Sequence, residues 1–173
     1  MISQFAFDAP ATRACGAGLA RALLKQAVSA HPLVITLTGE LGAGKTTFVG
    51  GLLAELGHAG PVRSPTYTLI EPYHLQGRDL HHCDFYRLRS PDELDDLGWR
   101  DLLTAGSILL VEWPDKAGDR LGRTDLAIAF EYANGAAARN IAFEAHSELG
   151  EDVSQGIRVR FVRLGWFVNG NAF

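Results

Sequence analysis

Cysteine and lysine are both scarce in this sequence. The 173 residues include two cysteines, Cys15 and Cys83, which are far apart and do not form a C-x-x-C pair. This spacing does not indicate a disulfide framework. Because so few thiols favour a reducing compartment, we expect a cytoplasmic protein. No stretch is long and apolar enough to span a membrane, and the first residues lack the pattern of a secretory signal. We expect no membrane partner.

A clustered basic surface is also lacking. Lysine and arginine total 16 against 20 acidic residues, which gives a formal net charge of −4. Because phosphate backbones are bound through clustered basic residues, we expect any contact with RNA to run through a partner protein. Arg158, Arg160 and Arg163 form the nearest thing to a basic cluster. The alternation over residues 157–162 would place Arg158 and Arg160 on one solvated face of a strand.

Apolar residues suffice for one hydrophobic core. Hydrophobic residues make up 47% of the chain and charged residues 21%, which fits one globular domain over residues 1–173. Residues 33–38 predict a buried strand, and residues 46–56 predict a helix that ends at Gly57. Two antiparallel hairpins are expected, over residues 67–73 with 80–86, and over residues 125–132 with 139–145 through Asn134-Gly135. The pattern predicts an α/β fold with a central mixed sheet.

A glycine-rich segment connects the predicted strand at 33–38 to the predicted helix at 46–56. Its sequence is Gly39-Glu40-Leu41-Gly42-Ala43-Gly44-Lys45-Thr46. It matches the P-loop pattern G-x-x-x-x-G-K-[ST], and with only three lysines in the chain a chance match is expected on the order of a few times per thousand such chains. The strand before it and the helix after it supply the context that the motif requires. We therefore expect this phosphate loop (residues 39–46) to bind ATP.

The residue types in the phosphate loop suit a nucleotide with bound magnesium. Gly42 and Gly44 allow the backbone to curl so that successive N–H groups and the positive end of the helix point at phosphate oxygens. Lys45 would neutralise the β- and γ-phosphates, and the Thr46 hydroxyl would bind Mg²⁺. Thr47 is a further candidate for a phosphate hydrogen bond.

Such a site also needs an acidic residue near the metal and a group that orients the attacking water. Glu112 ends the apolar run at residues 108–112, and Asp84 ends the less apolar run at residues 80–84. The residue types alone leave open which acid takes which role. Trp113 directly follows Glu112 and could cover the site or fill the core, of which the core is the more frequent role for tryptophan. His81, His82 and Cys83 do not favour a zinc site, because on a strand His82 faces away from the other two.

Four blocks of the sequence together resemble the bacterial TsaE (YjeE) family, over about residues 5–143. The blocks are residues 39–48, which contain the phosphate loop, and the segments Ser64-Pro65-Thr66-Tyr67-Thr68-Leu69, Asp84-Phe85-Tyr86-Arg87-Leu88 and Glu112-Trp113-Pro114. The resemblance implies a Mg²⁺-dependent ATPase required for threonylcarbamoyladenosine formation in tRNAs that read codons beginning with A. It implies TsaB and TsaD as partners, with TsaD transferring the threonylcarbamoyl group.

The resemblance also assigns roles that the residue types leave open. It gives Glu112 to the metal together with Thr46, and Asp84 to catalysis through the attacking water. It places Thr66 near the γ-phosphate in a switch loop and makes Trp113 an aromatic residue important for activity. Thr12 matches a threonine that contacts the nucleotide. In the family a short helix usually follows the last hairpin, whereas residues 165–173 fit no such pattern. The role of the tail, residues 150–173, therefore stays open.

Three other functions fit parts of the sequence. A small-molecule kinase would share the phosphate loop, and Arg120 and Arg123 could serve as its lid. A GTPase would find D-x-x-G in Asp95-Asp96-Leu97-Gly98, but the chain has no N-K-x-D segment to bind guanine. A non-enzymatic switch, whose ATP state controls a partner, lies close to the family function.

Overall fold

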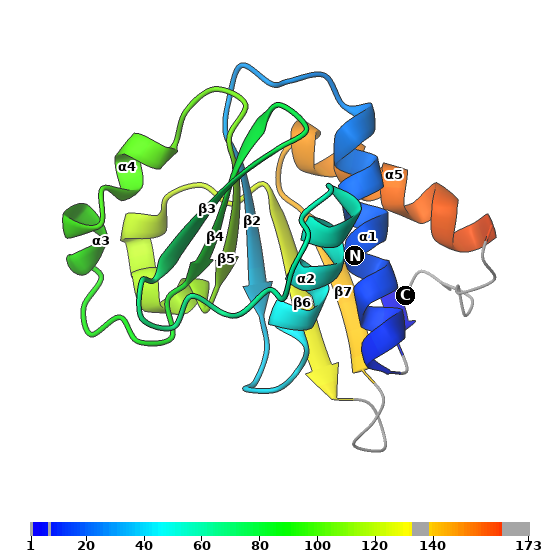
Figure 1. Ribbon diagram of the computed structural model, residues 1–173, viewed down its shortest axis with the longest axis horizontal. Helices are drawn as coiled ribbons and strands as arrows, with labels where there is room; N and C mark the ends of the chain where they lie inside the picture. The colour runs from blue at the N-terminus through cyan, green and yellow to red at the C-terminus, as the bar shows by residue number, and fades with distance from the viewer. Residues whose placement is uncertain (1, 7, 133–138, 164–173) are drawn as a thin grey trace.

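The computed structural model of the protein describes residues 2–6, 8–132 and 139–163. Within these residues, the strands form one seven-stranded sheet in the order β1-β7-β6-β2-β5-β4-β3 (Figure 1). The strands are β1 (Ile2–Ala6), β2 (Leu33–Thr38), β3 (Ile70–Leu75), β4 (Arg78–Asp84), β5 (Ile108–Glu112), β6 (Leu126–Tyr132) and β7 (Arg139–Ala145). The helices are α1 (Ala9–Lys25), α2 (Lys45–Glu55), α3 (Glu93–Asp96), α4 (Trp99–Leu102), η1 (Pro114–Leu121) and α5 (Glu148–Arg163).

The centre of the sheet is parallel and its edges are antiparallel. Strand β2 pairs in parallel with β5 and β6, and β5 pairs in parallel with β4. The hairpins β3–β4 and β6–β7 are antiparallel, as predicted, and β1 joins the edge at β7. The predicted α/β fold with a mixed sheet is therefore confirmed. Because β2, β5 and β4 run in the same direction, their carboxyl ends meet at one edge of the sheet.

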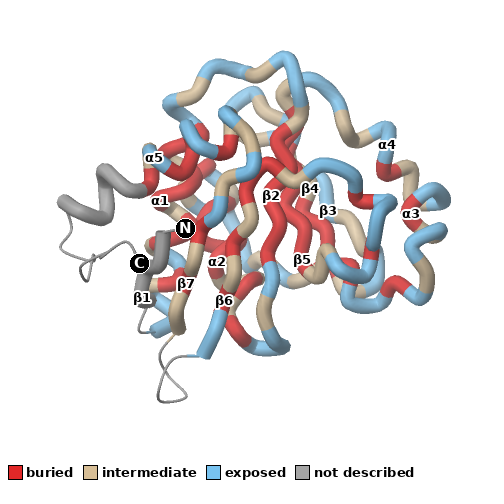
Figure 2. The backbone as a smooth tube through the Cα atoms, turned by 180° about the vertical axis from the view of Figure 1, so that it is seen from behind, coloured by how far each residue is buried: buried red, intermediate tan, exposed pale blue. Residues whose placement is uncertain are grey.

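Helices cover both faces of the sheet, and each face has its own core. Helices α1, α2 and α5 lie on one face, where Ile35 and Leu37 of β2 pack with Leu110 of β5. On the other face, Val34 and Val111 pack against side chains of α3, α4 and η1. Strands β2 and β5 are buried over almost their whole length, and β4 is buried over its last three residues (Figure 2). The phosphate loop therefore follows a buried strand, and each of the two acids lies at the buried end of a strand.

Helices α1 and α2 touch backbone to backbone through glycine. A Cβ atom added to Gly16 would lie 2.0 Å from the carbonyl oxygen of Phe48, and one added to Gly51 would lie 2.0 Å from the carbonyl oxygen of Arg13. No side chain fits at these distances. The contact fixes the position of α2, whose first turn belongs to the phosphate loop.

Replacing Gly51 by alanine is therefore expected to lower the free energy of unfolding by about 1 to 3 kcal/mol, since the added methyl group must push α1 away. Gly50→Ala is the matched control in the same helix, because its Cβ would meet only the flexible end of Arg13 at 3.3 Å. The control should be neutral or slightly stabilising. Urea unfolding measures both, and equal stability of the two variants would contradict the close packing.

Two strand boundaries differ from the sequence prediction. Strand β3 begins at Ile70 rather than at residue 67, because Leu69 closes a turn in which its N–H donates to the Pro65 carbonyl at 2.7 Å. Leu69 has a φ of 62°, which a strand does not accommodate. Strand β4 covers Arg78–Asp84, so the predicted hairpin partner is displaced toward the turn by two residues. Asp84 is consequently the last residue of its strand.

The predicted strand over residues 157–162 is wrong, because these residues belong to helix α5. The helical spacing of Leu149, Val153 and Ile157 brings all three to the core next to α1, and this spacing decides the conformation. Helix α5 follows the last hairpin. The predicted turn at Asn134-Gly135 and the end of the tail, residues 164–173, lie outside the described residues. In the part that is described, no helix combines the length and apolar character needed to cross a bilayer.

Candidate functional site

The phosphate loop leaves the carboxyl end of β2 and enters α2 directly. Gly39, Gly42 and Gly44 have φ values of 138°, 79° and 106°, which residues with a Cβ rarely adopt. Gly44 occupies the N-cap position of α2, and because it has no side chain it makes no capping hydrogen bond. The first N–H groups of a helix have no partner within the helix. They are therefore available to an anion, which they attract together with the helix dipole.

Two side chains from the β6–β7 hairpin hold the outer side of the phosphate loop. The hydroxyl of Tyr132 donates to the Leu41 carbonyl at 3.0 Å. Arg139 donates from Nε to the Ala43 carbonyl at 2.9 Å and from Nη2 to the Gly42 carbonyl at 3.3 Å. The carbonyl oxygens of three successive loop residues are thereby held by hydrogen bonds to the hairpin. No local sequence pattern points to these two residues, since they come from the other end of the chain.

Lys45 lies across the phosphate loop. Its Nζ donates to the carbonyls of Gly39 at 2.6 Å and Glu40 at 3.0 Å, and lies 4.1 Å from the ring centroid of Trp113. Burial lowers the pKa of the Lys45 ammonium, and nearby carboxylates led by Glu112 oppose this shift. The aromatic ring and the loop carbonyls keep the cation next to the first turn of α2.

Glu112 ends β5 and is held by two hydrogen bonds to the same oxygen. Thr46 Oγ1 donates to Glu112 Oε1 at 2.9 Å, and His82 Nε2 lies 2.9 Å from that oxygen. The carboxylate is 3% exposed. A hydroxyl and a carboxylate at this distance form the all-oxygen donor set that Mg²⁺ prefers. Thr46 and Glu112 therefore fit a magnesium ion beside the phosphate loop.

Asp84 lies directly beside Glu112 in the register of the parallel pair β4–β5. The Ser64 hydroxyl donates to Asp84 Oδ2, and the backbone N–H of Tyr86 donates to Oδ1 at 3.0 Å. Burial raises the pKa of Asp84; the Tyr86 N–H opposes this shift, and the Glu112 carboxylate adds to it. The net shift is upward, despite the further lowering effects of His82 and Lys45. A carboxylate with a raised pKa accepts a proton more readily than an ordinary one.

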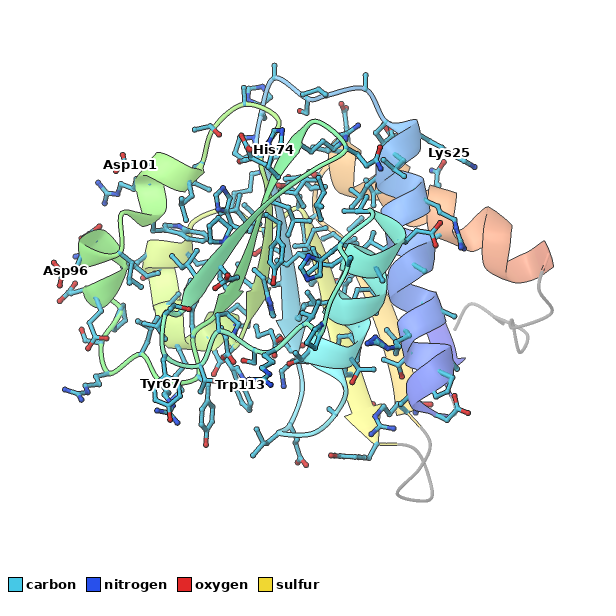
Figure 3. The ribbon with its side chains drawn as sticks, viewed as in Figure 1. Lys25, Tyr67, His74, Asp96, Asp101 and Trp113 are labelled. Carbon is cyan, nitrogen blue, oxygen red and sulfur yellow. The ribbon has the colours of Figure 1, made fainter. Side chains whose placement is uncertain are left out.

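The segment before β3 brings Thr66 to the same place. Thr66 Oγ1 donates to the Ser64 carbonyl at 3.1 Å within this segment. Both ends of the segment are tied to the end of β4, because the Ser64 hydroxyl donates to Asp84 Oδ2 and the N–H of Asp84 donates to the Leu69 carbonyl at 2.9 Å. Tyr67 is 87% exposed and lies under the guanidinium of Arg87. Figure 3 shows Tyr67 and Trp113 at the sheet edge where β2 passes into the phosphate loop.

These groups enclose one pocket of about 280 Å³. Its lining includes ten of the residues predicted from the sequence, namely Leu41, Gly42, Gly44, Lys45, Thr46, Thr47, Thr66, Asp84, Glu112 and Trp113. Ser64, Tyr86 and Arg87 also line it. Three predicted residues contribute from behind, since Gly39 and Glu40 bind Lys45 through their carbonyls and Ala43 is 1% exposed.

Thr12 is a further predicted nucleotide contact that lies outside this pocket. Its side chain is 0% exposed, and its hydroxyl donates to the Asp8 carbonyl at 2.9 Å within the first turn of α1. The Thr12 methyl group packs behind Gly44, within 3.4 Å of where a Cβ would lie. Thr12 therefore contacts the phosphate loop rather than the pocket.

The residues singled out for a kinase or a GTPase lie elsewhere. Arg120 forms ion pairs with Asp92 and Asp95, at 2.7 and 2.5 Å, and Arg123 pairs with Asp125 at 2.8 Å. Neither arginine lines the pocket. The D-x-x-G segment lies at α3, where Asp96 projects away from Trp113 (Figure 3).

Comparisons with known proteins identify relatives of this chain in sequence and in fold. A sequence profile of the family described as threonylcarbamoyl adenosine biosynthesis protein TsaE matches residues 7–141. The tRNA threonylcarbamoyladenosine biosynthesis protein TsaE of Haemophilus influenzae is 42% identical over 121 residues, which cover 70% of this chain and 75% of the relative. The protein of the same name from Bacillus subtilis is 40% identical over 112 residues, which cover 65% and 69%. The crystal structure of Bacillus subtilis YdiB superposes with a TM-score of 0.71 at 28% identity, covering 92% of this chain and 95% of that one.

Proposed function

We propose, from the premise that this chain belongs to the TsaE family of threonylcarbamoyladenosine biosynthesis proteins, that it is a Mg²⁺-dependent ATPase and a nucleotide switch. The switch acts on a TsaB–TsaD complex that modifies tRNAs reading codons beginning with A. The chain reaches tRNA through that complex, in keeping with its net charge of −4.

One observation carries the ATPase proposal. Three side chains meet at the ends of three adjacent parallel strands. They are Lys45 in the phosphate loop after β2, Glu112 of β5 at the Thr46 hydroxyl, and Asp84 of β4, whose pKa is raised. A P-loop NTPase needs these three groups for phosphate binding, metal binding and activation of water.

In this mechanism each residue has a separate task. Lys45 and the first N–H groups of α2 bind the phosphates and hold the γ-phosphate in place. Thr46 and Glu112 hold Mg²⁺, which neutralises charge that develops on the phosphates. Asp84 orients the attacking water and accepts its proton, and Trp113 keeps Lys45 in position and shields the site from bulk water.

The switch is proposed to lie in residues 64–69. Ser64 and Leu69 bind the carboxyl and the backbone of Asp84, so a shift of Thr66 toward a γ-phosphate is transmitted to the catalytic carboxylate. Tyr67, on the same segment, is exposed and available to a partner. Segments that respond to a γ-phosphate in this way are a common form of nucleotide switch.

A small-molecule kinase receives no such support. Its lid would need cationic side chains that reach the phosphates, whereas Arg120 and Arg123 are engaged in ion pairs away from the pocket. The ATPase switch is therefore the function that the geometry supports best.

Retention on an immobilised TsaB–TsaD complex tests the proposal. We expect the retained amount of this chain to differ by about fivefold or more between ATP, ADP and no nucleotide, because a switch couples nucleotide and partner binding. Lys45→Ala should abolish the dependence on nucleotide, and the exposed Lys116→Ala should keep it. Equal retention in all three conditions would rule out nucleotide gating.

A further inference from the structure

His82 is a buried polar side chain that the proposed mechanism does not use. It lies on β4, two residues before Asp84, and is 0% exposed. Its Nε2 lies 2.9 Å from Glu112 Oε1, and its Nδ1 is buried with no hydrogen-bond partner among the described residues. A leucine or methionine would fill the same space without leaving a buried nitrogen unpaired.

The hydrogen bond identifies the ring nitrogen that donates. An ionised carboxylate only accepts hydrogen bonds, so the bond to Glu112 requires a proton on Nε2. Nδ1 is then the nitrogen that is buried without a partner, which carries a cost. The buried ring thereby places one N–H group, that of Nε2, against Glu112 Oε1.

Glu112 Oε1 receives this N–H group and the Thr46 hydroxyl from two different elements, β4 and α2. Two donors on one oxygen hold the carboxylate plane in a single orientation. Such an orientation leaves the other oxygen for a cation next to Thr46. Groups that orient a metal-binding carboxylate in this way are an established means of tuning metal affinity.

We propose that His82 is a positioning residue that orients Glu112 for the divalent cation. The inference rests on the metal role of Glu112 under the proposed function. It assigns His82 no contact with the nucleotide, so its loss should weaken binding of the cation and leave metal-free nucleotide binding intact.

Three substitutions separate orientation from packing. His82→Gln keeps an amide N–H near the position of Nε2, whereas the shorter His82→Asn keeps an amide that cannot reach Glu112. His82→Met fills the space without a donor and serves if the asparagine variant does not fold. His81→Asn is the matched control, since His81 is the neighbouring residue on the opposite face of β4 and also has a buried, unpaired Nδ1.

Electron paramagnetic resonance of Mn²⁺ with the protein–ADP complex gives the cation affinity, and calorimetry without metal gives the ADP affinity. We expect His82→Asn and His82→Met to weaken Mn²⁺ binding by about tenfold or more, the range found for groups that orient metal ligands. His82→Gln should stay much closer to the unmodified protein, and His81→Asn should not change. The metal-free ADP affinity should be the same in all variants.

Unchanged Mn²⁺ affinity in His82→Asn or His82→Met would overturn the inference, and so would a glutamine variant as weak as these two. A parallel loss of metal-free ADP binding would also overturn it, because it would indicate a damaged pocket.

Glu112→Gln distinguishes a failure of the His82 inference from a failure of the proposed function. If Glu112→Gln weakens Mn²⁺ binding and the His82 variants do not, the His82 inference alone fails. If Glu112→Gln has no effect, the proposed metal role of Glu112 fails.

Discussion

Replacing Lys45 by alanine is expected to weaken ATP binding by about 10- to 100-fold, the loss typical of a charge-assisted hydrogen bond. Hydrolysis should fall further, by about 10²- to 10³-fold, because charge on the γ-phosphate oxygens is stabilised most in the transition state. The physical reason is the position of Nζ, which the carbonyls of Gly39 and Glu40 and the Trp113 ring hold beside the first turn of α2. Calorimetric titration and a phosphate-release assay measure the two quantities.

The control for this variant is Lys116→Ala, which removes an exposed lysine on η1. It alters the net charge by the same amount and should leave both quantities unchanged. ATP affinity within about twofold of the unmodified protein in Lys45→Ala would contradict the assignment of residues 39–46 as the phosphate site.

Replacing Asp84 by asparagine is expected to separate binding from chemistry. Asparagine has nearly the same shape, so the phosphate loop is left intact and ATP affinity should change little. It cannot accept a proton from water, so hydrolysis should fall by about 10²- to 10⁴-fold, the usual contribution of a general base. Single-turnover hydrolysis measures the chemical step, and Asp79→Asn, at an exposed position on the same strand, is the control.

The same carboxyl group predicts a pH dependence. Burial raises the pKa of Asp84 above the ordinary value of 3.8, so protonation begins at a higher pH than for an exposed aspartate. The proton acceptor is the ionised form, so kcat/KM should decline as the pH falls through this raised pKa and be constant above it, as far as Asp84 is concerned. In Asp84→Asn the residual activity should lack this acidic decline. An unchanged decline would assign it to another group.

The phosphate loop was predictable almost to the residue because its signals are local. The apolar run at 33–38 is buried along β2 up to Leu37, and the glycines that the motif requires take the positive φ values that only glycine adopts easily. The two acids were predictable for a similar reason. Each follows a strand pattern, and parallel pairing of β4 with β5 then places Asp84 directly opposite Glu112.

The errors arose where tertiary packing decides the conformation. The alternating residues 157–162 suit a strand when taken alone. However, Val153 and Ile157 pack next to α1 at helical spacing, and helix α5 continues through residues 157–162. The strand expected from residue 67 begins later because the segment at Leu69 is tied to Asp84 by a backbone hydrogen bond. Strand propensity alone carries no information about such a tether.

Other parts of the site depend on contacts between distant segments. The sequence places His82 on the same strand face as Asp84, but its hydrogen bond to Glu112 requires the register between β4 and β5. Arg139 and Tyr132 reach the phosphate loop only because β6 pairs with β2. Thr12, conversely, is near the loop in space yet has its hydroxyl bound within α1.

We propose that ATP hydrolysis at this pocket drives tRNA modification. The rate of threonylcarbamoyladenosine formation in a reaction that contains TsaB, TsaD and this chain tests this proposal most directly. Over several rounds of tRNA modification, the wild-type protein should sustain the reaction, whereas Lys45→Ala and Asp84→Asn should not. Asp84→Asn should fail although it still binds ATP. If tRNA were modified with Asp84→Asn as fast as with the wild-type protein, the account would be contradicted, because hydrolysis at this site would not be required.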